Sequence, residues 1–207
     1  MRPDELFQYV DMILDDYGNQ HCRAIASPRI VSLVPSITEL LFELGLGDKV
    51  VGRTGFCIHP RELVKTVPKV GGTKDINMRK LIALQPTHVV VNIDENTLQT
   101  YEDLCAVVDN VIVTHPNTVT DNARLYLMLG QIFGEEERAG ELLVQLEEKL
   151  QMITSYTKHL DHLNVLYLIW RDPWMTVSKN TYIAQMLKII NCQTVPASPS
   201  TRYPSLS

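Results

Sequence analysis

The fold is decided by residues 29–54, which read RIVSLVPSITELLFELGLGDKVVGRT. The continuous apolar run at 30–34 predicts a buried strand, and the leucines that follow at helical spacing predict a helix that ends at Gly45. Ser36 stands at the start of this helix, where we expect its hydroxyl to cap the first turn. A second short strand is predicted at 50–53. A strand, a helix and another strand in this order favour parallel pairing, because the helix carries the chain back across the sheet.

The same alternation continues along the chain. Apolar strands are predicted at 87–92 and 110–115, with a helix at 98–107 between them. Residues 29–133 are therefore expected to form one α/β lobe with a parallel sheet. Residues 1–28 are expected to be an N-terminal extension to this lobe.

Residues 134–160 predict one long helix, because leucines recur every three or four residues with charged residues between them. A helix of this length exceeds what a crossover over one sheet normally needs, so we expect it to connect two lobes. Residues 161–207 begin a second lobe with a strand and a helix but are too few for an independent core. The predicted fold is α/β, with two parallel-sheet lobes joined by one long α-helix and the second lobe incomplete.

The composition excludes several classes of protein. The 207 residues include 24 acidic and 19 basic side chains, for a net charge of -5, so a broad nucleic-acid surface is not expected. The four cysteines form no CxxC pair, which argues against a zinc knuckle and a thioredoxin motif. We recognise no secretory signal or lipidation site, and no apolar run approaches the roughly 20 residues of a membrane span.

The order of several motifs over about residues 29–207 resembles the helical-backbone metal receptors. These are the substrate-binding proteins of ABC importers for cobalamin, ferric siderophores and haem. Besides the opening stretch, the motifs are FCIHP at 56–60, VGGTKDIN at 70–77, LIALQPTHVVVN at 81–92 and LIWRDPWMTVSKNTYIAQML at 168–187.

The resemblance implies a receptor that holds a metal complex in the cleft between two lobes, with little hinge motion. The complex would be a corrinoid, a ferric siderophore or haem, delivered to an ABC permease and its ATPase. It implies a monomeric transport protein of the periplasm or cell envelope, without a tightly bound cofactor and without enzymatic activity.

Three features depart from the family pattern. Members normally continue further, so we expect this chain to be truncated at its C-terminus. Exported members carry a signal peptide or lipobox, and none is recognised here, so a cytoplasmic location stays open. A glutamate that docks on the permease usually follows the VGGT loop, whereas this chain has Arg79 there. We therefore expect weaker docking on a standard importer.

Candidate ligand-binding residues follow the predicted strands, because loops at the carboxyl ends of parallel strands gather at one edge of a sheet. Ser36 follows the first strand, where helix N–H groups would meet an anion. The next loop carries Arg53, Phe56, Cys57 and His59. A ring and a guanidinium can stack on a flat chelate, and thiol and imidazole suit transition metals, although this spacing is also typical of packed loop residues. We assign no metal site firmly and name His59 as the candidate ligand.

Two further loops contribute candidates. Thr73 and Lys74 follow paired glycines, which permit close approach of the backbone to a ligand. The resemblance places an aromatic residue near Thr73 in cobalamin-binding members, which makes cobalamin less favoured here. Asn92 and Glu95 belong to the polar segment NIDEN, which also suits a turn with a helix cap.

The strongest single feature is the group Trp170, Arg171 and Trp174. Both tryptophans of the chain lie within five residues of each other at a strand end, as a stacking wall for a flat macrocycle or catecholate would require. The simpler structural interpretation is an ion pair between Arg171 and Asp172, with the tryptophans anchoring the lobe.

Two other functions stay open at this point. One is an intracellular metal- or tetrapyrrole-handling protein, or a metal-dependent enzyme, that uses Cys57 and His59. We find no recognisable catalytic motif that would support the enzyme. The other is an incomplete chain that binds nothing.

Overall fold

The computed structural model describes residues 12–196 and 201–206. The described chain divides into two compact units. Of the described residues, the first unit contains 12–115 and 126–140, and the second contains 116–125, 141–196 and 201–206. No helix in these described ranges is both long enough and apolar enough to cross a membrane.

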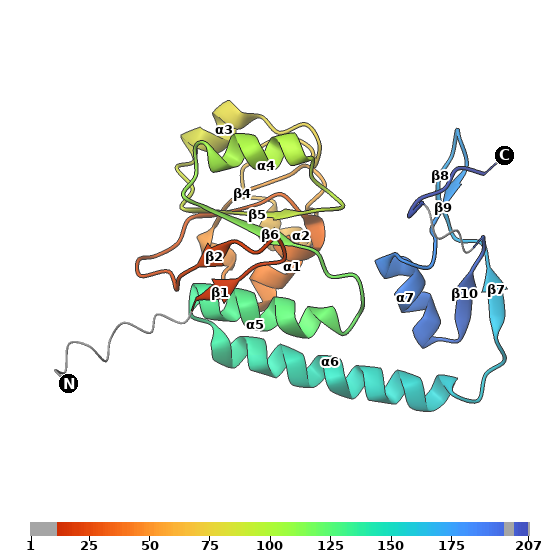
Figure 1. Ribbon diagram of the computed structural model, residues 1–207. Coiled ribbons are helices and arrows are strands. Elements are labelled where there is room, and N and C mark those ends of the chain that lie inside the picture. Colours follow the sequence, from red (N-terminus) through yellow and green to blue (C-terminus); the bar gives the residue numbers. More distant parts are fainter. Residues whose placement is uncertain (1–11, 197–200, 207) are drawn as a thin grey trace. The chain divides into compact units, whose positions relative to one another are not determined.

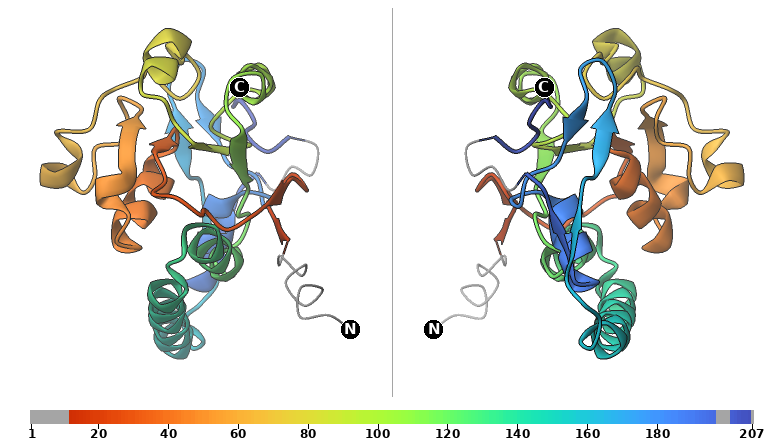
Figure 2. Two further views of the ribbon diagram at one scale, coloured as in Figure 1. Left: turned by 90° about the vertical axis from the view of Figure 1, so that its left-hand side faces the viewer. Right: turned by 90° about the vertical axis from the view of Figure 1, so that its right-hand side faces the viewer.

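The first unit is built on a parallel four-stranded sheet, as predicted. Its strands, in the order β4-β3-β5-β6, are β4 (Val50–Arg53), β3 (Ile30–Ser32), β5 (His88–Asn92) and β6 (Asn110–Thr114). Helices α3 (Met78–Ala83) and α4 (Leu98–Cys105) cover one face, and α1 (Pro35–Glu43) and the later part of α5 (Asp121–Phe133) cover the other (Figures 1 and 2). Short helices η2 (Gly47–Lys49) and α2 (Arg61–Val64) flank β4 in the sequence.

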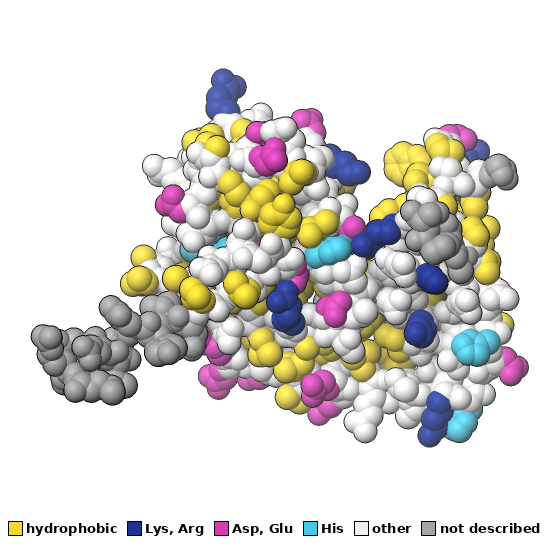
Figure 3. Space-filling model, in the orientation of Figure 1, with side chains coloured by type: hydrophobic (Ala, Val, Ile, Leu, Met, Phe, Trp, Pro, Cys, Tyr) yellow, Lys and Arg dark blue, Asp and Glu magenta, His cyan; other side chains and the backbone are white. Residues whose placement is uncertain are grey.

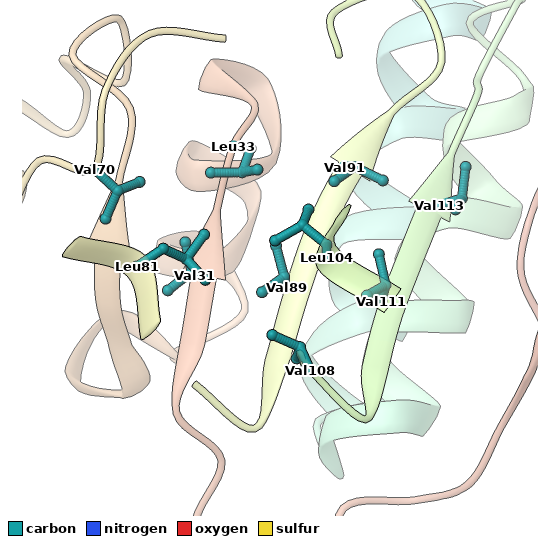
Figure 4. Packing of buried hydrophobic residues seen from close by; sticks show 10 residues of the cluster. All are labelled: Val31, Leu33, Val70, Leu81, Val89, Val91, Leu104, Val108, Val111 and Val113. Atoms are coloured by element: carbon teal, nitrogen blue, oxygen red, sulfur yellow. The ribbon is translucent and has the colours of Figure 1, made fainter. Parts of the chain in front are cut away.

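One core cluster of this unit lies between the sheet and the helices α3 and α4 (Figure 4). Alternate strand residues point to this face, because side chains alternate between the two sides of a strand. The core cluster consists of Val31, Leu33, Val70, Leu81, Val89, Val91, Leu104, Val108, Val111 and Val113.

The predicted cap at Ser36 is wrong. The strand β3 ends at Ser32, and α1 begins at Pro35 with Val34 as its N-cap and without a side-chain capping bond. Proline suits the first helical position because it has no N–H to satisfy and its φ is already helical. Ser36 therefore lies within the first turn, with its side chain exposed.

An N-terminal hairpin, which was not predicted from the sequence, covers the β6 edge of the sheet. Its strands are β1 (Ile13–Leu14) and β2 (Gln20–His21). The buried carboxylate of Asp15 accepts hydrogen bonds from the Val113 backbone N–H at 2.8 Å and lies 3.0 Å from His21 Nε2. Burial raises the pKa of Asp15, but the hydrogen bonds outweigh burial and lower it overall. Covering an edge strand in this way removes unpaired backbone groups from solvent.

The second unit contains a parallel pair and a hairpin. β7 (Leu163–Val165) pairs in parallel with β10 (Cys192–Thr194), and β8 (Leu168–Trp170) pairs antiparallel with β9 (Met175–Thr176). Helix α7 (Tyr182–Ile189) lies between β9 and β10 in the sequence. The long helix α6 (Glu136–Thr157) runs from the first unit into the second, which agrees with the predicted connecting helix.

One histidine makes the first unit sensitive to acid. His88 is buried at the start of β5, where its Nδ1 lies 2.8 Å from Thr87 Oγ1 and its ring stands edge-on to Phe133. Burial, with a smaller effect of His21, lowers the pKa of His88 to about 4. As the pH falls below about 6.5, His88 therefore binds a proton in the unfolded chain but stays neutral in the folded chain, which favours unfolding.

We expect the free energy of unfolding to fall by about 2 kcal/mol between pH 7 and pH 5 because of this group alone. The loss should occur in the window between about pH 6.5 and pH 4. Urea denaturation at a series of pH values measures it. His88→Asn should remove this part of the pH dependence, whereas His159→Asn, at an exposed position, should retain it. An unchanged pH dependence in His88→Asn would contradict the assignment.

Candidate functional site

The loops after the parallel strands gather at one edge of the first unit. Two backbone-anchored contacts hold three of these loops together. The Gly55 N–H donates to the Gly71 carbonyl oxygen at 2.7 Å, and the Asn96 side-chain amide donates to the Thr73 carbonyl oxygen at 2.8 Å. The loop after β4, the GGTKD loop and the loop after β5 therefore form one connected surface, as the parallel sheet predicted.

Phe56 is the prominent side chain on this surface. Its ring is 64% exposed, which is unusual for a phenylalanine, and it lies beside Gly72. A Cβ at Gly72 would stand 3.5 Å from the ring, so the glycine leaves one side of the ring open. An exposed ring of this kind is suited to stacking on a flat apolar ligand.

The other loops of this surface carry the polar candidates. Lys74 and Glu95 are exposed, and Thr73 and Asn92 are partly exposed. Asn92 is fixed by its own loop, since its backbone N–H donates to Asn96 Oδ1 at 2.9 Å. These two loops therefore offer the Lys74 ammonium and the Glu95 carboxylate to solvent, on backbone segments that hydrogen bonds hold together.

Two other predicted residues of the loop after β4 are buried. The Cys57 side chain is fully buried, with its Sγ 3.1 Å from Thr54 Oγ1. Arg53 is 5% exposed and donates to the carbonyl oxygens of Val64, Thr54 and Cys57. These two side chains fix the shape of the loop, while His59 in the same loop is exposed.

No metal-binding cluster is found in the part of the chain that the structure describes. Within residues 12–196 and 201–206, no three His, Cys, Asp or Glu side chains come together in a way that would hold an ion. The burial of the Cys57 thiol separates it from the exposed His59 imidazole.

A small hollow beside α4 was not predicted from the sequence. It has a volume of about 150 Å³, and its walls include Tyr17, Asn92, Leu98 and Tyr101. The rings of Tyr17 and Tyr101 meet edge to face at 5.2 Å, and burial, with a hydrogen bond to Cys105, raises the pKa of Tyr101. Figure 3 shows hydrophobic side chains gathered on this face below α4. Tyr17 belongs to the hairpin that was not predicted, and no pattern in the sequence indicated that this residue reaches the sheet.

In the second unit, the β8–β9 hairpin exposes both tryptophans. Trp170 is 63% exposed and Trp174 is 47% exposed. The Arg171 guanidinium carbon lies 5.8 Å from the centre of the Trp174 ring, a cation–π distance. Among the described residues, Arg171 forms no ion pair with Asp172. The predicted ion pair between these two residues is therefore wrong. Figure 3 shows hydrophobic side chains gathered on the same hairpin.

Arg79 lies on α3 with its side chain exposed. It makes no ion pair with another residue in the described ranges, so its charge is directed to solvent. This is the position at which the resemblance predicted a docking glutamate.

Curated relatives of this chain include an ABC transporter substrate-binding lipoprotein and vitamin B12-binding proteins. It is 31% identical to an uncharacterized ABC transporter substrate-binding lipoprotein of Bacillus subtilis over 89% of this chain and 60% of the relative. It is 23% identical to the vitamin B12-binding protein of Vibrio parahaemolyticus over 86% of this chain and 65% of that protein. The chain thus spans less than two thirds of the length of these relatives.

Solved structures share the fold. The periplasmic vitamin B12 binding protein of Vibrio cholerae matches with a TM-score of 0.80 at 19% identity, over 87% of this chain and 70% of that chain. The periplasmic heme-binding protein of Roseiflexus sp. RS-1, in its apo form, matches with a TM-score of 0.78 at 25% identity, over 88% of this chain and 71% of that chain. The predicted fold class, two α/β lobes with a long connecting helix, is confirmed.

The sequence profile of the periplasmic binding proteins matches residues 30–207, which is most of the chain. The chain therefore belongs to the periplasmic binding protein family.

Proposed function

We propose that this protein captures a metal chelate outside the cytoplasm and delivers it to an ABC permease and its ATPase. The observation that carries the proposal is the exposure of three large aromatic rings on loops next to strand ends. These are Phe56 in the first unit and Trp170 and Trp174 in the second. A large exposed ring costs free energy in water, and a flat apolar ligand that stacks on such a ring recovers that cost.

The relatives support the class of ligand. One curated relative and one structural neighbour bind vitamin B12, and another neighbour binds heme. Both ligands are flat macrocycles around a metal, and both suit stacking on Phe56 or Trp174. A ferric siderophore is the third candidate, since Lys74 and Arg171 offer cations to an anionic chelate.

The alternative function through Cys57 and His59 is less well supported. A thiol must be accessible and ionised to act as a nucleophile or metal ligand. The Cys57 thiol is fully buried and hydrogen-bonded to Thr54. The monomeric state and the absence of enzymatic activity also stay proposals.

The proposal predicts saturable binding of at least one chelate. Intrinsic tryptophan fluorescence of the purified chain should be quenched by cobalamin, haemin or a ferric siderophore, after correction for ligand absorbance. Quenching is expected because Trp170 and Trp174 are exposed and within reach of a ligand on the β8–β9 hairpin. The absence of saturable quenching by all three ligands, confirmed by calorimetry, would contradict the proposed function.

A substitution tests the stacking role of one ring. Trp174→Ala should weaken binding of the ligand so identified by about 1 to 3 kcal/mol, because a desolvated aromatic contact is lost. Isothermal titration calorimetry measures this without relying on the removed fluorophore. Tyr156→Ala is the control, since Tyr156 is an exposed aromatic residue on α6, away from the β8–β9 hairpin in the sequence. Equal affinities of Trp174→Ala and the unaltered chain, with the fold intact, would reject the role.

The permease contact can be tested through Arg79. Arg79→Glu should increase the stimulation of ATPase activity in a reconstituted cobalamin or haem importer, because it restores the acidic side chain that the resemblance places there. Lys80→Glu changes the charge equally at the neighbouring exposed position and should have a smaller effect. An equal response to both substitutions would indicate a general charge effect and would contradict a docking role for position 79.

A further inference from the structure

A second hollow in the first unit is rich in cationic side chains. It lies beside α2 and has a volume of about 470 Å³. Its lining residues are Arg53, Ile58, His59, Arg61, Val64, Lys65 and Lys69. Four of these seven side chains carry a permanent positive charge, and none is acidic. This contrasts with the net negative charge of the whole chain.

The buried member of this group is Arg53. Its side chain lies in the interior, since the residue is only 5% exposed. Its Nε donates to the Val64 carbonyl oxygen at 2.9 Å, and its Nη1 donates to the carbonyl oxygens of Thr54 at 3.2 Å and Cys57 at 2.9 Å. A guanidinium has five N–H groups, one on Nε and two on each Nη. The hydrogen bonds of Arg53 use those on Nε and Nη1, whereas the two on Nη2 make no hydrogen bond to the described part of the chain.

Arg53 also lacks a counter-ion. All of its acceptors are neutral carbonyl oxygens, and no carboxylate of the described residues pairs with it. A buried charge that is not neutralised is costly, and the usual remedy in proteins is a paired ion of opposite sign. The structure thus holds a mostly buried cation in place, with its Nη2 donors at the wall of an open hollow.

The other cations are positioned by the backbone around Arg53. The Arg53 N–H donates to the Pro68 carbonyl oxygen at 3.0 Å, and the Val70 N–H donates to the Arg53 carbonyl oxygen at 2.9 Å. These bonds extend the sheet beyond β4 and fix Lys69 directly beside Arg53. Arg61 and Lys69 form no ion pair within the described ranges, and Lys65 forms only an exposed pair with Glu62.

We propose that this hollow binds a phosphate group, either of a soluble phosphate compound or of a lipid headgroup. A phosphate dianion matches the chemistry of the hollow, because guanidinium N–H groups pair with its oxygens and several cations share its charge. The site is separate from the aromatic surface around Phe56, which does not line it. The inference therefore does not depend on the proposed capture of a metal chelate.

Calorimetric titration of the full chain with inorganic phosphate and with glycerol phosphate, at low salt, tests the soluble source. Sedimentation with phosphatidic acid vesicles, compared with phosphatidylcholine vesicles, tests the lipid source. The double variant Arg61→Gln, Lys69→Gln should weaken binding at least about tenfold, since two charge-assisted contacts are lost. The double variant Arg79→Gln, Lys80→Gln removes the same charge from α3 and should change binding less than about twofold.

Arg53→Lys gives an independent measurement at the buried position. It keeps the charge but loses the planar donors, so it should weaken phosphate binding while circular dichroism reports whether the fold is intact. If Arg53→Lys does not fold, the two surface double variants decide alone. Saturable binding that is lost in the Arg61, Lys69 double variant and kept in the Arg79, Lys80 double variant supports the site. Binding in the calorimetric titration indicates a soluble phosphate compound, and binding in the vesicle sedimentation indicates a lipid headgroup. No saturable binding in either arm, or an equal loss in both double variants, would overturn the proposal.

Discussion

The parallel pairing of β3 with strands on both of its sides is the constraint on which the first unit depends. β3 contributes only Ile30–Ser32, yet it holds β4 on one side and β5 on the other. Because all strands of this sheet run in one direction, their carboxyl ends and the loops after them lie at the same edge. Phe56, Thr73 and Asn92 are close in the fold for this reason, although the sequence separates them widely.

Polar side chains, not only the apolar core, complete this sheet at both edges. At the β6 edge the buried carboxylate of Asp15 binds the backbone of Val113 and holds the N-terminal hairpin in place. At the β4 edge Arg53 ties together the loop after β4 and α2 through three carbonyl oxygens. A buried polar group must find partners to be tolerated, so each of these side chains fixes the chain segments that surround it.

The sequence predicted those features that depend on local pattern. Apolar runs gave the strands of the first unit, and leucine spacing gave the long helix α6. It failed where a partner is distant in the chain, as for the hairpin around Asp15, whose contact with Val113 joins residues 98 positions apart. The sequence also could not show which of Phe56 and Cys57 is exposed, because both lie in one short loop. In the fold, Cys57 is buried and Phe56 is exposed.

The loop after β4 shows how one segment can serve two surfaces. Its backbone alternates between side chains that turn inward, Arg53 and Cys57, and side chains that stay in solvent, Phe56 and His59. The inward residues are linked, since Arg53 Nη1 donates to the Cys57 carbonyl oxygen, next to Phe56 in the chain. An anion that bound Arg53 would act on the same guanidinium that sets the shape of this loop.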